Sequence, residues 1–329
     1  MTKVTIELDV VFERSKAALM RHGASEFAAS EVAKAVRKAE EVGNLICGLY
    51  YLESYCAQLQ TGRVNGTVEP VVSKPKSASV MVDAGFGFAQ PAFARGLPEA
   101  LRTAHDAGTC AFAVCHAHTC TSLGYFTEQI ALAGLIGIGF TNAFPVVCPP
   151  GGNKAVIGTN PIAMSVPAKG RGVAFQFDQS TSAVARGKIT MAASAGMDIP
   201  LGWAVDVDGN PTTDPKEAMK GSLASTGGYK GFGFGLMAEI LAAAVTGSVN
   251  SLDVGGLKLP NGAPHDLGQF YFLIDPTTFS GDAFWDRLAR ISDAVAEQDG
   301  ARMPGTGKTL PERVEIDSDV WDQLIELAG

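Results

Sequence analysis

Short apolar segments and amphipathic helical segments alternate along the chain from about residue 70 to residue 280. Runs rich in β-branched and aromatic residues predict strands at 71–72, 79–82, 111–114, 136–141, 163–166, 173–177 and 269–274. Longer periodic runs predict helices at 90–107, 122–133 and 230–244. Because the two kinds of element interleave, the predicted fold class is α/β (α+β), with helices packed on a central sheet.

Both ends of the chain are mainly helical in pattern. Helical patterns at 15–20, 25–42 and 49–59 precede the alternating region, after a possible short strand at 4–8, and further helical patterns at 279–297 and 318–327 follow it. We therefore predict a helical subdomain formed by residues 1–62 and 283–329, around an α/β domain over residues 63–282.

The composition and charge of the chain argue against several classes of partner. Its 329 residues carry a formal net charge of −8, which offers no basic face for nucleic acid. No apolar run is long enough to span a membrane, and the first residues, MTKVTIELDVVFERS, lack the apolar core of a secretion signal. The six cysteines form no C-x-x-C pair, so we expect free thiols in a reducing cytoplasm.

The stretch Gly85-Phe86-Gly87-Phe88-Ala89-Gln90 follows a predicted strand and opens a predicted helix, as a dinucleotide-binding turn does. The third glycine of the G-x-G-x-x-G pattern is missing, and no convincing acidic residue ends a second strand about twenty residues later. These departures favour a plain strand–turn–helix over a Rossmann site. Any nucleotide site is therefore expected to be of another kind.

The stretch Cys115-His116-Ala117-His118-Thr119-Cys120 is the densest group of soft metal ligands in the sequence. Thiolate and imidazole suit zinc, but no second ligand pair with a matching spacing occurs elsewhere, so no metal site is predicted. A histidine at the end of a strand is a better candidate for a general acid or base. A turn histidine without a chemical role is the remaining alternative.

Two glycine-containing segments are candidates for ligand contacts. Gly228-Tyr229-Lys230-Gly231 opens the apolar helix, where free backbone amides and one lysine can hold a phosphate or a carboxylate. The alternative is a glycine seam that lets two elements pack closely. Ile157-Gly158-Thr159-Asn160-Pro161 has the composition of a constrained loop that enters a strand. The residues alone leave the chemistry of both segments open.

Five motifs follow one another over much of the chain, at Gly158-Thr159-Asn160-Pro161, Asp178-Gln179-Ser180-Thr181-Ser182 with Ala185-Arg186-Gly187, Gly202-Trp203-Ala204-Val205-Asp206 with the downstream Pro-Thr-Thr-Asp-Pro, Gly228-Tyr229-Lys230-Gly231, and Arg302-Met303-Pro304-Gly305. In this order they resemble the type 2 malate/L-lactate dehydrogenase family. That family includes malate, lactate, sulfolactate and ureidoglycolate dehydrogenases, and reductases of Δ1-piperideine-2-carboxylate and Δ1-pyrroline-2-carboxylate.

The resemblance implies a nicotinamide-binding fold that is not a Rossmann fold: a large, mostly antiparallel sheet with helices, plus a helical subdomain formed by both chain ends. It also implies an intertwined homodimer, a small carboxylate substrate, and NADP(H) or NAD(H) bound by the 63–282 domain. The cofactor contacts that it implies are Thr119, Cys120, Thr121, Thr141, Asn142, Asp178, Gln179, Ser180, Lys230, Arg302, Met303, Pro304, Gly305 and Lys308. The substrate contacts that it implies are Gly48, Tyr51, Thr159 and Asn160.

The chain departs from the family around the substrate. Family members usually carry Ser-His-Gly, then an arginine three residues after the glycine and a tyrosine four residues further. The aligned residues here are Ile46-Cys47-Gly48, Tyr51 and Tyr55, so the serine, histidine and arginine are all replaced. The family's second active-site histidine falls at or beside Thr119, and His118 is the residue next to it.

These replacements change the expected chemistry. Oxidation of a 2-hydroxy acid needs a base for the hydroxyl proton, which contributes roughly 10²–10⁴-fold to the rate, and it benefits from a cation on the substrate carboxylate. Reduction of a protonated cyclic imine needs less, because the iminium carbon already accepts hydride. We therefore predict reduction of a cyclic imine carboxylate of the Δ1-pyrroline-2-carboxylate type, with Cys47, Tyr55 and His118 as candidate catalytic residues. A 2-hydroxy acid dehydrogenase and a redox-inactive nucleotide- or acid-binding protein are the alternatives.

Overall fold

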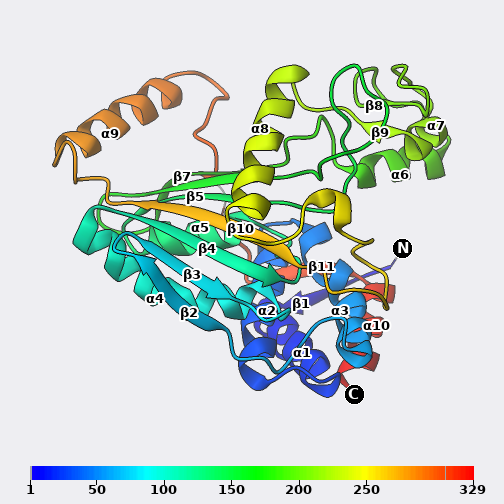
Figure 1. Ribbon diagram of the computed structural model, residues 1–329, viewed down its shortest axis with the longest axis horizontal. Coiled ribbons are helices and arrows are strands. Elements are labelled where there is room, and N and C mark those ends of the chain that lie inside the picture. The colour runs from blue at the N-terminus through cyan, green and yellow to red at the C-terminus, as the bar shows by residue number, and fades with distance from the viewer. Residues whose placement is uncertain (1, 308) are drawn as a thin grey trace.

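The computed structural model describes residues 2–307 and 309–329. Its centre is a seven-stranded sheet with the strand order β2-β3-β4-β10-β5-β6-β7 (Figure 1). The strands are β2 (Val71–Lys76), β3 (Ser79–Asp83), β4 (Thr109–Ala117), β5 (Ile136–Thr141), β6 (Ile162–Pro167), β7 (Val173–Gln179) and β10 (Leu267–Ile274). β3 and β4 run parallel, and the other neighbours are antiparallel. The predicted α/β class and the mostly antiparallel sheet are confirmed.

Helices cover both faces of this sheet, and those predicted over 90–107, 122–133 and 230–244 are present. α4 (Ala89–Ala107) and α5 (Gly124–Leu132) pack on one face, over a core of aromatic and aliphatic side chains. α8 (Tyr229–Glu239), which continues into a π-helical segment, Ile240–Ala244, packs on the other face. α4 approaches the sheet closely at Gly96, because a Cβ there would come within 2.7 Å of the Phe112 ring.

The two ends of the chain pack together, as Figure 1 shows by the position of both termini. β1 (Lys3–Glu7) pairs antiparallel with β11 (Arg313–Asp317). Around this pair, four helices share a core: α1 (Leu8–Arg21), α2 (Glu26–Glu41), α3 (Leu52–Thr61) and α10 (Ser318–Ala328). The sequence predicts β1 but not β11, although Val314 and Ile316 alternate with charged residues as in a half-buried strand.

α9 (Ala283–Ala296) lies apart from the joined ends, on the far side of the sheet in Figure 1. The helix is amphipathic in sequence, yet it buries none of its residues. The division of the chain at residues 63 and 283 stays a prediction. α9 belongs to the predicted helical subdomain but lies apart from the paired chain ends.

A small lobe between β7 and α8 is not predicted from the sequence. It contains α6 (Arg186–Ala195), α7 (Pro215–Lys220) and the two-residue strands β8 (Ala204–Val205) and β9 (Ser222–Leu223). The lobe has its own apolar core, which includes Val147, Ile157, Ile189 and Leu223. The start of α6 faces the segment that joins α2 to α3, since a Cβ on Gly187 would lie 3.6 Å from Cδ1 of Ile46.

Within residues 2–307 and 309–329, no helix has both the length and the apolar character that a bilayer crossing requires.

Candidate active site

The segment between α2 and α3 carries residues predicted to meet the substrate. Two 3₁₀ turns, Leu45–Cys47 and Leu49–Tyr51, flank Gly48. A Cβ at residue 48 would collide with the carboxylate of Glu40, which accepts a 2.8 Å hydrogen bond from the backbone N–H of Leu49. Burial raises the pKa of Glu40. A side chain at residue 48 would displace the Glu40 carboxylate from this hydrogen bond, so glycine preserves the contact that fixes the path of the segment.

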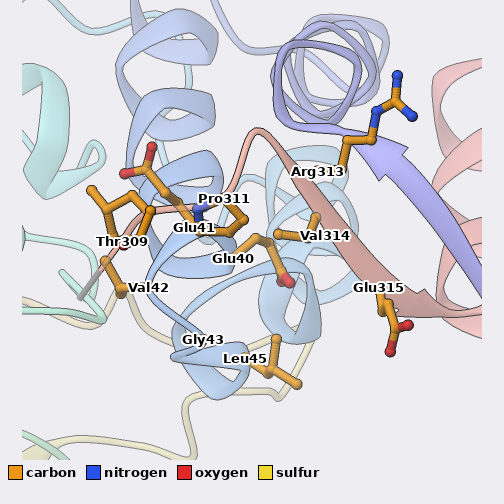
Figure 2. Close-up of a pocket in the computed structure, with 11 residues that line it drawn as sticks. Glu40, Glu41, Val42, Gly43, Leu45, Thr309, Pro311, Arg313, Val314 and Glu315 are labelled. Carbon is orange, nitrogen blue, oxygen red and sulfur yellow. The ribbon is translucent and has the colours of Figure 1, made fainter.

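A pocket of about 430 Å³ lies next to this segment, between the end of α2 and residues 309–315. Figure 2 shows Glu40, Glu41 and Leu45 facing Pro311 and residues of β11 across it. Among the residues that the structure describes, none of those predicted to act in catalysis or binding lines this pocket. The candidate site lies instead around Cys47, Tyr51 and Tyr55, with Asp178 close to Cys47.

The side chains of Cys47, Tyr51 and Tyr55 lie close together in the site. The rings of Tyr51 and Tyr55 stack with centroids 6.1 Å apart. Burial raises the pKa of the Cys47 thiol to about 12 and that of Tyr51 to about 12. Burial also holds the pKa of Tyr55 well above its ordinary range. All three side chains are therefore neutral at neutral pH.

Asp178 stands at the end of β7, against the start of α5. Its Oδ2 accepts a 2.7 Å hydrogen bond from the N–H of Gly124 and a 3.2 Å bond from the hydroxyl of Ser122. Part of the residue reaches solvent, but enclosure of the carboxyl raises the pKa of Asp178, against the lowering effect of these hydrogen bonds. The charge of Asp178 also contributes to the raised pKa values of Cys47 and Cys120. The three groups therefore lie near one another.

The loop over residues 302–305 runs along the same strand. Gln176 of β7 donates its backbone N–H to the carbonyl of Pro304 at 3.0 Å, and its side chain donates to the carbonyl of Gly124 at 3.0 Å. Gly305 has a φ of +82° and approaches Gln176 so closely that a Cβ would clash. The exposed Arg302 donates to the carbonyl of Thr306.

The structure thus brings three of the predicted cofactor segments into one region. These are the segment Thr119, Cys120 and Thr121, the segment Asp178, Gln179 and Ser180, and the segment Arg302, Met303, Pro304 and Gly305. The predicted contact Lys308 lies outside the described residues.

Thr141 and Asn142 are buried at the end of β5. The Thr141 hydroxyl donates to the carbonyl of Gly268 at 2.8 Å. The Asn142 side chain donates to the carbonyl of Val249 at 2.9 Å and accepts the N–H of Gly268 at 3.2 Å. Their polar atoms fasten the end of β5 to β10 and to the segment that follows α8. Contact with the cofactor remains a prediction for both residues.

Thr159 and Asn160 sit in the constrained loop that the sequence indicates. Asn160 has a φ of +36°, and its Nδ2 donates to Oε2 of the buried Glu239 at 2.7 Å. The carbonyl of Thr159 accepts the N–H of Thr181 at 2.9 Å, which joins the loop to the end of β7. Lys230 is exposed in the first turn of α8, where Gly228 offers no side-chain cap to the free amides.

His118 is buried against α3 and has a defined tautomer. Its Nε2 lies 2.8 Å from Oε1 of Gln58, and the Gln58 Nε2 donates to the carbonyls of Leu257 and Leu259. Since that amide oxygen can only accept, Nε2 of His118 carries the proton. The ring stacks on His265 with centroids 3.9 Å apart. Burial, and then His265, hold the pKa of His118 well below its ordinary value, so the ring is neutral.

Sequence reasoning missed Lys258, which enters the site from the segment before β10. Its Nζ lies 3.4 Å from the ring centroid of Tyr50 and 5.4 Å from that of Tyr51. Tyr51 stands where the family resemblance implies an arginine. Gln58, Thr61 and Arg63 hold this segment against α3 through the carbonyls of Gly256, Leu257, Leu259, Pro260 and Ala263. No local pattern signals a contact between residues about 200 positions apart.

The turn Gly85-Phe86-Gly87 is a strand–turn–helix, as the sequence predicts. It joins β3 to α4, and a Cβ on Gly85 or Gly87 would collide with the side chain of Val68. A pyrophosphate needs open space over such glycines. Val68 takes that space, so the turn does not fit a Rossmann dinucleotide.

Comparison with known proteins identifies the family. The conserved pattern of the malate/L-lactate dehydrogenase family matches residues 6–324. The chain belongs to this family. It is an oxidoreductase, as the sequence motifs predict.

Similar proteins within the family differ in their substrates. A (2R)-3-sulfolactate dehydrogenase (NADP(+)) of Chromohalobacter salexigens is 36% identical over 94% of this chain and 93% of its own length. A Δ1-pyrroline-2-carboxylate reductase of Burkholderia ambifaria is 34% identical over 99% of this chain and 98% of its own. The crystal structure of Δ1-piperideine-2-carboxylate reductase from Pseudomonas syringae pathovar tomato superposes with a TM-score of 0.91 at 30% identity, and the match covers 98% of this chain and 99% of that one.

Proposed function

We propose that this enzyme reduces a small cyclic imine carboxylate, of the Δ1-pyrroline-2-carboxylate type, with NADPH or NADH. The observation that carries the proposal is the protonation state of the site. Cys47, Tyr51 and Tyr55 keep their protons and His118 is a neutral ring, because burial acts on each of them. The three protonated groups cannot act as bases, and the lowered pKa of His118 makes its neutral ring a weak base for a hydroxyl proton.

An imine substrate fits such a site. A protonated iminium accepts hydride at carbon without any proton transfer from the enzyme in the same step. The Asp178 carboxylate supplies a negative charge near Cys47, and that charge offsets the positive charge of the iminium. The stacked rings of Tyr51 and Tyr55 supply a flat apolar wall for a five- or six-membered ring.

Lys258 supplies the cation for the substrate carboxylate. Its ammonium group lies against Tyr50 and Tyr51, at the position where the family arginine is replaced. Lys258 is exposed, and the segment that carries it is held to α3 by several hydrogen bonds. A lysine ammonium recognises a carboxylate as a point charge rather than in a bidentate manner.

The cofactor, when bound, supplies the hydride, and two features of the chain fit its phosphates. The first turn of α8 has free backbone amides with Lys230 beside them, which suits a phosphate group. The exposed Arg302 stands on the loop that runs alongside β7 and is a second candidate cation. The NADP(+) in the name of the sulfolactate dehydrogenase relative supports NADP(H) as the cofactor.

We further propose that the enzyme works as a homodimer in the cytoplasm. The outer face of α8 and its π-helical extension exposes Phe234, Leu236, Met237 and Ile240, and the nearly unpacked α9 exposes Ile291. Large apolar side chains exposed on a helix mark a protein interface. The six free thiols support a reducing compartment.

Consumption of NADPH and of NADH against Δ1-pyrroline-2-carboxylate, pyruvate and oxaloacetate tests the reaction. We expect kcat/KM for the imine to exceed that for either keto acid by at least about 100-fold, the contribution of one acid–base group. The reverse ranking would refute imine reduction and support the dehydrogenase of a 2-hydroxy acid, which the sulfolactate dehydrogenase relative favours. Cofactor binding without turnover of any substrate would instead support a redox-inactive binding protein.

Replacement of Lys258 tests how the carboxylate is held. Loss of a charge-assisted hydrogen bond worth about 1.5–3 kcal/mol predicts a fall in kcat/KM of roughly 10- to 150-fold for Lys258→Met, mainly through KM. Lys169→Met, in the exposed turn between β6 and β7, is the matched control and should leave both constants unchanged. Equal effects of the two variants would remove Lys258 from the site.

A further inference from the structure

Three potential metal ligands meet at the ends of the two parallel strands, away from Cys47 and Asp178. Asp83 is the last residue of β3, and Cys115 lies directly opposite it on β4. His116 follows Cys115. One ligand atom from each of the three side chains lies within 4.8 Å of the other two. The sequence offered only the cysteine and histidine, because the strand pairing that adds Asp83 cannot be read from it.

The His116 ring is held in the orientation that a metal ligand needs. Its Nδ1 lies 2.8 Å from Oδ1 of Asp266, so the carboxylate fixes the ring and leaves Nε2 free. In protein metal sites, a ligating histidine commonly makes such a bond to a carboxylate through its other nitrogen. The bond between His116 Nδ1 and Asp266 has this arrangement.

The backbone around this group is strained. His116 has a φ of +52°, Asp266 of +50° and Phe86 of +61°, and all three are non-glycine residues in the left-handed region. Such conformations cost on the order of 1 kcal/mol or more each and persist where the surroundings enforce them. The His116 N–H donates to the Ser248 hydroxyl at 2.9 Å, and its carbonyl accepts the N–H of Phe86 at 2.8 Å. These bonds hold the ring at the rim of the sheet.

We propose that Asp83, Cys115 and His116 bind zinc or a similar borderline divalent cation. A thiolate, an imidazole nitrogen and a carboxylate oxygen form a mixed ligand set that suits Zn²⁺, and water completes four-coordination. Binding releases the thiol proton of Cys115 to solvent and forms the metal–sulfur bond, with no change in oxidation state. The side chains must close by about an ångström to reach metal–ligand distances of roughly 2.0–2.3 Å. Asp83 is exposed, and its Oδ1 accepts the N–H of Gly85 at 2.8 Å, which leaves Oδ2 for the metal.

The electrostatics of the group favour a cation. The carboxylates of Asp83 and Asp266 lie close enough to Cys115 for their negative charges to act on it. A divalent ion would offset these negative charges and stabilise the thiolate. It would also tie the ends of β3 and β4 to Asp266, which ends the segment that carries Lys258.

Titration of the full-length protein with Co²⁺ tests the site. The wild type should show thiolate-to-cobalt charge-transfer absorption with one ion bound per chain, and Zn²⁺ should displace that ion. Cys115→Ser should abolish the absorption. Cys148→Ser is the matched control, because Cys148 is also a buried thiol that donates to a backbone carbonyl. It should leave the spectrum unchanged.

Two milder variants keep the test independent of folding. Asp83→Asn changes an exposed side chain and should weaken binding by at least about 10-fold, and Asp266→Asn should weaken it by about 10- to 100-fold. Zn²⁺ should also raise Tm of the wild type and of Cys148→Ser, and leave that of Cys115→Ser unchanged. Cobalt absorption without a thiolate component, or binding that is equal in Cys115→Ser and the wild type, would overturn the proposal.

Discussion

Replacement of Gln58 by leucine should destabilise the protein by an amount that follows from three hydrogen bonds. The Gln58 Nε2 donates to the carbonyls of Leu257 at 2.7 Å and Leu259 at 2.8 Å, and its Oε1 accepts from Nε2 of His118 at 2.8 Å. The two carbonyl bonds contribute about 1 kcal/mol each, since those carbonyls can turn to water. The His118 N–H is buried and loses its partner, at about 1–3 kcal/mol. The free energy of unfolding should therefore fall by about 3–5 kcal/mol.

Urea unfolding at neutral pH measures this loss. Gln298→Leu is the control, because Gln298 is exposed just after α9 and its side chain donates to the Ala294 carbonyl of that helix. The segment over 254–266 should also become more sensitive to proteolysis, because Gln58 is one of its anchors. Since Lys258 lies on that segment, KM for the imine should also rise in Gln58→Leu. A loss below about 1 kcal/mol would refute the reasoning, because it would mean that neither the segment nor His118 depends on Gln58.

Three further predictions concern buried groups. Cys47→Ser should change kcat by less than about 3-fold, because a thiol whose pKa is about 12 is a poor acid at neutral pH. A loss of kcat beyond about 100-fold would instead identify Cys47 as the proton donor. Burial lowers the pKa of His265 to about 3, whereas histidine in the unfolded chain takes up its proton near pH 6.5. The unfolded state therefore binds more protons below about pH 6.5, and the free energy of unfolding should decrease there by up to about 1.4 kcal/mol per pH unit. His265→Asn should remove that part of the slope in urea unfolding, and an unchanged slope would contradict it. Glu239→Gln should cost about 3 kcal/mol of stability in the same assay, since the Glu239 carboxylate accepts from Asn160 and twice from Ser251, and a cost near zero would show that these bonds are unimportant.

Local patterns predicted the elements that carry strong periodicity. The structure contains the strands predicted over 111–114, 136–141 and 269–274 and the helix predicted over 90–107. Each buries an apolar face, which appears in the sequence as a periodic pattern of apolar residues. The sequence did not predict α6, because this alanine-rich helix buries only Ile189 and so has no apolar periodicity. β11 is short, and its partner β1 lies at the other end of the chain, so its pairing has no local signal.

The family resemblance implied site residues in distant parts of the chain, Asp178 among them, but the residue patterns alone indicate proximity only where the site is continuous in sequence. Cys47, Tyr51 and Tyr55 lie on one segment and are gathered as expected. Lys258 and Asp178 reach the same region from distant parts of the chain, through strand order and hydrogen bonds to α3. The protonation states also depend on burial, which the three-dimensional packing determines. His118 illustrates this, since a strand-end histidine in sequence becomes a neutral, enclosed ring in the fold.

The pH dependence of kcat/KM for Δ1-pyrroline-2-carboxylate tests most directly whether the site supplies no titrating acid. Above the pH range in which Asp178 becomes protonated, the proposal predicts a profile that follows only the protonation of the substrate imine. The midpoint should be the same in the wild type, in Cys47→Ser and in His118→Gln. Both of those groups are held in their neutral forms by burial. An additional titration near neutral pH that disappears in either variant would contradict the proposal, because it would identify an enzyme group that donates the proton.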